Sequence, residues 1–97
     1  MNNNITEDYC SPKVSSLLEE KGMARGAWLV PTQALAIKWI RENFNIWYSI
    51  GMQSKDYFTL TIYRNNPDIT IIYNDKGFKT SEEAINAALL YTLKHLI

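Results

Sequence analysis

The pattern of apolar and polar positions first predicts a helix in residues 12–21, between Ser11-Pro12 and Gly22. Serine is favoured as the cap of a helix start, proline at the first helical position, and glycine directly after a helix end. A stripe of three apolar residues is too short to hold a helix in water, so we expect this one to pack against the rest of the domain. The stripe has helical spacings of three and four and consists of Val14, Leu17 and Leu18.

A second and longer helix is predicted from Pro31-Thr32 to Asn43. One of its faces is broad and apolar and the other is charged, so we expect the helix to contribute to the core. Residues 23–30 before it have no clear period and are interpreted as a connector, with Trp28 and Leu29 packed on the core. The apolar positions of the helix are Ala36, Ile40 and Phe44, flanked by Leu35, Ile37 and Trp39.

After Asn43 the spacing of apolar residues changes from about 3.6 to 2, which is typical of strands. Three such segments follow, at residues 45–50, 57–63 and 69–73. The stretches between them are short and rich in turn-forming residues. We therefore expect an antiparallel meander, because parallel strands need longer crossover connections.

Residues 74–77 have the composition of a turn, and Thr80 stands where it could cap a last helix from residue 81 to the C-terminus. The predicted fold class is α+β, in the order α-α-β-β-β-α, with a three-stranded antiparallel meander and the helices packed on one of its faces. We predict a single domain over residues 11–97 and a loosely ordered polar segment over residues 1–10.

Composition and charge exclude several classes of protein. Ninety-seven residues suffice for one core, and ten Lys and Arg balance ten Asp and Glu. The positive charge that is usual for a nucleic-acid-binding protein is therefore missing. The single cysteine, Cys10, cannot form an intramolecular disulfide, and the sequence has neither an apolar run of membrane-spanning length nor the pattern of a signal peptide. We expect a cytoplasmic protein.

No pattern in the sequence predicts catalysis, a cofactor or a metal site. His95 is the only histidine, and no Cys, Asp or Glu stands three or four positions before it, which favours a structural or surface role. The four glycines are isolated, and no Gly-x-Ser-x-Gly motif occurs. We predict a protein that is not an enzyme and has no catalytic, cofactor-binding or metal-binding residues.

Two apolar surfaces of the predicted fold are candidates for an interface. The sheet face opposite the helices has no element left to cover it, and a stripe on the last helix could be covered by the apolar stripe of the first helix. An uncovered patch of this kind usually marks an interface, so we predict a homodimer that buries one of them. A platform for stacking bases or sugars is the alternative for the sheet face, and simple cross-strand stabilisation is the plainest interpretation. The candidate interaction residues are Trp47, Tyr57, Tyr63 and Ile72 on the sheet and Leu90, Leu93 and Ile97 on the helix.

Residues 32–97 resemble the double-stranded-RNA-binding domain in the order and length of their elements, and their alanine-patterned last helix is similar to that of the family. Members of the family begin this helix with lysines that meet phosphates. Thr80, Ser81, Glu82 and Glu83 occupy those positions here. The resemblance therefore implies the fold and disfavours RNA binding.

A second resemblance covers nearly the whole chain. Residues 5–9, 17–22, 31–41 and the Ser-Glu-Glu-Ala start of the last helix are similar to small uncharacterised proteins that recur in gut Bacteroidales and their phages. This resemblance implies a cytoplasmic accessory protein of a mobile element and transfers no site residues. The function expected from the sequence is a non-enzymatic protein-interaction module. The alternatives are a nucleic-acid-binding domain that uses the aromatic sheet face and an enzyme of unrecognised mechanism.

Overall fold

The structure of the chain, a computed structural model, describes residues 9–23 and 31–97. Residues 1–8 of the predicted loose segment, and the predicted core contacts of Trp28 and Leu29, lie outside the described residues. The order of the elements confirms the predicted α+β class. These elements are α1 (Pro12–Glu20), α2 (Gln33–Phe44), β1 (Trp47–Ser54), β2 (Tyr57–Asn65), β3 (Ile69–Phe78), α3 (Ser81–Tyr91) and the π-helix η1 (Thr92–Leu96).

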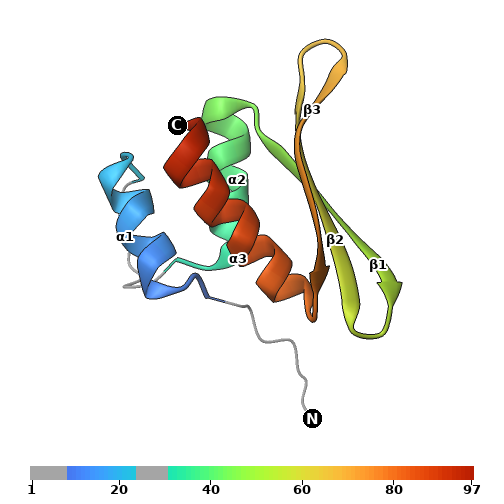
Figure 1. The fold of residues 1–97 in the computed structure, drawn as a ribbon. Coiled ribbons are helices and arrows are strands. Elements are labelled where there is room, and N and C mark those ends of the chain that lie inside the picture. Colours follow the sequence, from blue (N-terminus) through green and yellow to red (C-terminus); the bar gives the residue numbers. More distant parts are fainter. Residues whose placement is uncertain (1–8, 24–30) are drawn as a thin grey trace.

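The described elements lie in three layers (Figure 1). The sheet is antiparallel with β2 in its centre, so the predicted meander is confirmed. Helices α2 and α3 cover one face of the sheet, and α1 lies on the other side of α3, where it packs against α3 and η1. No described element covers the second face of the sheet (Figure 1), which we call the open face.

Helix α1 begins and ends where the sequence predicts. Its N-cap is Ser11, whose hydroxyl oxygen accepts a hydrogen bond from the amide of Val14 at 3.3 Å. At the other end Gly22 has φ 106°, and the amide of Met23 donates to the carbonyl of Leu18 at 3.0 Å. This is the Schellman arrangement, which needs a residue that tolerates a positive φ after the helix.

The core lies between the sheet and the helices. Leu60 and Ile62 of β2 face it, and Ile40 of α2 meets them from the helix layer; each of the three is at most 1% exposed. Cys10 is also buried, and its amide donates to the carbonyl of Pro31 at 2.9 Å. Cys10 thus packs with the folded domain, although the sequence places it in a loosely ordered segment.

The predicted turn at residues 74–77 is wrong, because these residues belong to β3. Asn74, Asp75 and Lys76 pair with Thr61, Leu60 and Thr59 of β2 in one continuous ladder. β3 is an edge strand, where side chains that favour turns stay in water and cost little. Gly77 has φ 89° and lies at an irregularity of the ladder, so it produces a bulge instead of ending the strand.

The apolar stripe predicted for the last helix is not an open surface. Leu93 is 1% exposed, because α1 packs over α3 and η1. Leu90 and Ile97 are partly buried and pack against the same core. Helix α1 therefore covers this stripe, as the sequence allowed, and the sheet face remains as the candidate surface.

Candidate interaction surface

An apolar row crosses the open face from one edge of the sheet to the other. Trp47 of β1 pairs with Tyr63 of β2, and Tyr63 pairs with Ile71 of β3. Because side chains alternate along a strand and Ile62 points into the core, all three point away from the core. We call Trp47, Tyr63 and Ile71 the apolar row.

Trp47 is held in place by residues of β2 and α2 and by the residue that ends α2. Its ring stacks beside that of Tyr63, with 6.4 Å between centroids and 20° between planes, and the guanidinium carbon of Arg41 from α2 lies 5.2 Å from the indole centroid. The indole N–H donates to the side-chain oxygen of Asn45 at 2.9 Å. Asn45 ends α2 with φ 55°, a conformation that asparagine adopts more readily than most residues. Tertiary contacts therefore fix the orientation of the indole.

The third strand presents different residues from those predicted. Ile72 lies at an irregularity in the pairing of β3 with β2 and packs against the core, so its predicted place on the open face is wrong. Ile71 and Ile69 point outward instead and are 59% and 66% exposed. Strict alternation within residues 69–73 cannot locate this extra residue, because a bulge depends on the partner strand.

From the apolar row toward the β1–β2 turn, the open face becomes polar. The next two rows are Ser49, Thr61 and Asn74, and then Gly51, Thr59 and Lys76. The Thr61 hydroxyl donates to the Asn74 side-chain oxygen at 2.9 Å, and the Thr59 hydroxyl donates to the Gly51 carbonyl at 3.4 Å. We call these six residues the polar rows. A shallow hollow of about 420 Å³ lies along β2 and β3 at these rows, lined by Thr59, Leu60, Thr61, Asn74, Asp75 and Lys76.

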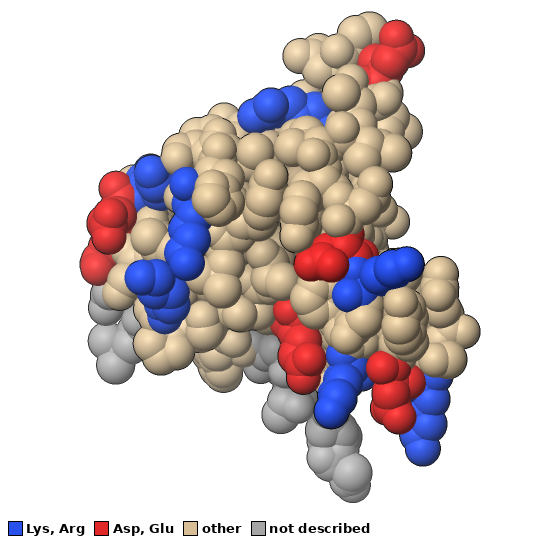
Figure 2. Space-filling view, in the orientation of Figure 1, with Lys and Arg blue, Asp and Glu red and all other residues tan. Residues whose placement is uncertain are grey.

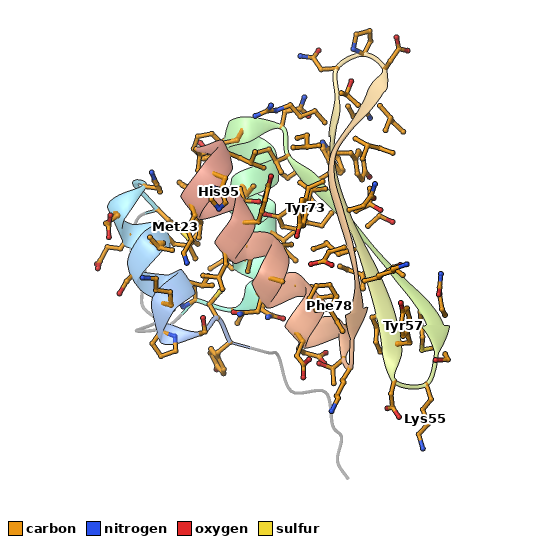
Figure 3. The ribbon with its side chains drawn as sticks, in the orientation of Figure 1. Met23, Lys55, Tyr57, Tyr73, Phe78 and His95 are labelled. Atoms are coloured by element: carbon orange, nitrogen blue, oxygen red, sulfur yellow. The ribbon has the colours of Figure 1, made fainter. Side chains whose placement is uncertain are left out.

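Tyr57 stands apart from the other predicted surface residues. It pairs with Ser54 beside the β1–β2 turn, at the opposite end of β2 from Tyr63 (Figure 3). The two tyrosines are six positions apart along the strand, or about 20 Å at the usual rise per residue. The structure thus brings together Trp47 and Tyr63 from the predicted set, adds Ile69 and Ile71, and leaves Tyr57 at the far margin.

Two further groups that the sequence singles out, His95 and Cys10, lie outside the open face. His95 is exposed in η1 and lies 5.0 Å from the ring of Tyr91, which stacks on Tyr73 of β3 at 4.0 Å. Burial raises the pKa of the Cys10 thiol to about 11. Within residues 9–23 and 31–97, no three His, Cys, Asp or Glu side chains gather as metal ligands. The helices of this part of the chain are all too short or too polar to cross a membrane.

Comparison of the chain with known protein families, curated proteins and solved structures finds no match.

Proposed function

We propose that this protein is a non-enzymatic interaction module that binds another protein through its open face. The observation that carries the proposal is the apolar row, continued by Ile69, which spans all three strands on a face that no described element covers. The centres of protein interfaces are rich in aromatic residues and poor in charge. Of the residues in the apolar row and the polar rows, Lys76 alone is charged.

Nucleic acid fits the open face less well than protein does. A strand of bases needs aromatic faces for stacking and cations along its phosphates. Arg41 and Tyr63 already contact the Trp47 ring, and Lys76 is two rows away from it. Figure 2, in which the sheet is seen edge-on, shows Lys and Arg close to Asp and Glu on the side in view.

The same reasoning applies to double-stranded RNA at the start of α3. Thr80 caps this helix, and Glu82 and Glu83 follow in its first turn with both side chains exposed. These carboxylates would stand where the double-stranded-RNA-binding domain presents lysines to phosphate, so like charges would meet.

The single cysteine and the resemblance to small Bacteroidales and phage proteins support a cytoplasmic accessory role for the module.

The proposal is tested by comparing two variants that exchange equally exposed apolar residues for lysine. Ile69 on the open face is 66% exposed. Met52 is 67% exposed and lies on the helix side of β1, the same side as Tyr48 and Ile50. Immobilised wild type, Ile69→Lys and Met52→Lys chains are incubated with a lysate of the native host. We expect proteins to be retained by the wild type and Met52→Lys and lost with Ile69→Lys.

Equal retention by all three chains would remove the open face from the proposed function. A parallel titration with fluorescent duplex RNA and single-stranded DNA, read by anisotropy, separates the two classes of ligand. Micromolar, salt-sensitive binding that Ile69→Lys leaves unchanged or strengthens would favour the nucleic-acid alternative.

A further inference from the structure

We propose that Arg41 and Trp47 form a carboxylate-binding site at the margin of the open face, and that the partner protein presents an aspartate or glutamate side chain there. Apolar residues of the partner, next to this acidic side chain, then cover the apolar row. This inference rests on the proposed function and adds the chemistry of the partner. It follows from the position, the fixed orientation and the unused hydrogen-bond donors of the Arg41 guanidinium.

The guanidinium reaches from the helix layer to the open face. Arg41 lies in the last turn of α2, and α2 runs into β1 through Asn45 and Ile46 alone (Figure 1). Trp47 is the first residue of β1, which is an edge strand, and it begins the apolar row. Because its guanidinium carbon lies 5.2 Å from the indole centroid, Arg41 stands at the end of this row.

A closed set of contacts holds Arg41 in this position. The backbone amide of Asn45 donates to the carbonyl of Arg41 at 3.1 Å, and the Asn45 side-chain oxygen accepts from the Trp47 indole at 2.9 Å. The Arg41 side chain closes the set through its contact with the indole ring. The Asn45 side-chain nitrogen donates to the carbonyl of Asn65 at 3.4 Å, which ties the set to β2. A side chain that is already oriented loses little conformational freedom when a ligand binds.

The donors of the guanidinium are available to a ligand. Among the described residues, Arg41 forms neither an ion pair nor a hydrogen bond through its side chain. Its nitrogens also reach water, because Ser15 Oγ is the one buried side-chain nitrogen or oxygen in this part of the chain that lacks a partner. The neighbouring Glu42 points about 100° away around the helix. A guanidinium in this state can donate two parallel hydrogen bonds to one carboxylate.

The isolation of this cation favours a carboxylate over phosphate groups. Lys76 is the nearest cation within the rows of the open face, and it pairs with Thr59, four positions or about 13 Å along β2 from Tyr63. A nucleic acid needs several cations along its phosphates, and phosphorylated peptides are bound by clusters of arginines. A single guanidinium matches the single charge of a carboxylate.

The neighbours of the site favour a partner protein other than a second copy of this chain. Arginine, tryptophan and tyrosine are the residues that contribute most to binding at protein interfaces, and Arg41, Trp47 and Tyr63 lie together here. The apolar side chains of a partner would exclude water from the ion pair and strengthen it. The apolar and polar rows of a second copy hold no carboxylate that could meet Arg41.

Titration with blocked dipeptides tests the site directly. N-acetylated, C-amidated Leu-Glu is added to the wild type at about pH 6, where its carboxyl group is ionised. The side-chain N–H signals of Arg41 and Trp47 are followed in nitrogen-15 NMR spectra. We expect saturable shifts of both signals, and binding at least about tenfold weaker for the isosteric but neutral Leu-Gln. Equal shifts with both peptides, or none with either, overturn the inference. Tighter binding of blocked phosphoserine than of Leu-Glu would assign the site to phosphate instead.

Three variants separate the guanidinium from charge in general. Arg41→Gln should abolish the shifts, and Arg41→Lys should weaken binding, because an ammonium keeps the charge without the planar fork. Arg64→Gln is the matched control, since Arg64 is exposed on the same strand as Tyr63 but outside the apolar row. Circular dichroism melts check that each variant is folded, and Arg41→Lys serves alone if Arg41→Gln is not. Equal binding by Arg41→Lys and the wild type, or loss of binding in Arg64→Gln, contradicts the site.

Failure of this inference differs from failure of the proposed function. Host proteins that are lost with Ile69→Lys but retained by Arg41→Gln would refute the carboxylate site and leave the open face as the binding surface. Host proteins retained equally by the wild type, Ile69→Lys and Arg41→Gln would refute both. A wild-type dimer that Arg41→Gln dissociates in sedimentation equilibrium would contradict a partner other than a second copy.

Discussion

The phenolic oxygen of Tyr48 lies 2.6 Å from the hydroxyl oxygen of Thr92, which ties β1 to the start of the π-helix η1. The single hydroxyl proton of Thr92 is directed to the carbonyl of Ala88, at 2.8 Å. The phenol of Tyr48 must therefore be the donor to Thr92. Thr92 is fully buried, so this bond links the sheet to the last helix inside the core.

Removal of the Tyr48 phenol should destabilise the protein. Tyr48→Phe leaves Thr92 without its donor, and we expect a loss of about 1–2 kcal/mol in the free energy of unfolding. The matched control is Tyr57→Phe at the β1–β2 turn, which should change that free energy by less than about 0.5 kcal/mol. Urea unfolding measures both, and equal losses would contradict the role of the buried bond.

Leu60 in the central strand should contribute more to stability than any residue of the open face. It is 1% exposed, so Leu60→Ala leaves a cavity and should cost roughly 2–5 kcal/mol. Ile69→Ala removes a side chain that is 66% exposed and should cost less than about 0.5 kcal/mol at concentrations where the chain is monomeric. A loss below 1 kcal/mol for Leu60→Ala in urea melts would show that β2 faces the other way.

Substitution of Gly51 should be unfavourable because a larger side chain would clash with Thr59, and not because of the backbone conformation of Gly51. A Cβ at Gly51 would stand 2.8 Å from the Thr59 hydroxyl oxygen, and Gly51 does not have a positive φ. We expect Gly51→Ala to cost about 1 kcal/mol as overpacking. In a Thr59→Ala background the same change should be neutral or stabilising. A double-mutant cycle measures this coupling, and additive effects would exclude the predicted clash.

Stability should decline at alkaline pH through Cys10. Burial raises the pKa of its thiol from 9.0 to about 11, so the folded state retains a proton that the unfolded state releases. The stabilisation of the folded state by the protonated thiol is complete below pH 9 and is lost as the pH rises to 11. Urea unfolding at pH 7, 9, 10 and 11 should show this decline, and Cys10→Ala should make it smaller. The decline that remains above pH 10 comes from Tyr48, because burial raises the pKa of its phenol as well. An identical slope in both chains would contradict the assignment.

Local pattern alone determined most of the elements and their faces. Ser11, Gly22 and Thr80 mark helix ends through the conformations and hydrogen bonds of their own residues, and these signals do not depend on distant parts of the chain. Alternation along β1 and β2 also placed Trp47 and Tyr63 on one face correctly, because each strand keeps its period through these positions.

Tertiary structure decided the third strand and the extent of the uncovered surface. Pairing with β2 draws residues 74–77 into β3 and inserts a bulge at Ile72, so Ile71 and Ile69 replace Ile72 on the open face. Leu93 is apolar and suitably spaced for an interface, yet α1 packs over its helix. A sequence period reports which side of an element is apolar. Which apolar side meets another element, and where a ladder takes up an extra residue, depend on contacts between segments far apart in the chain.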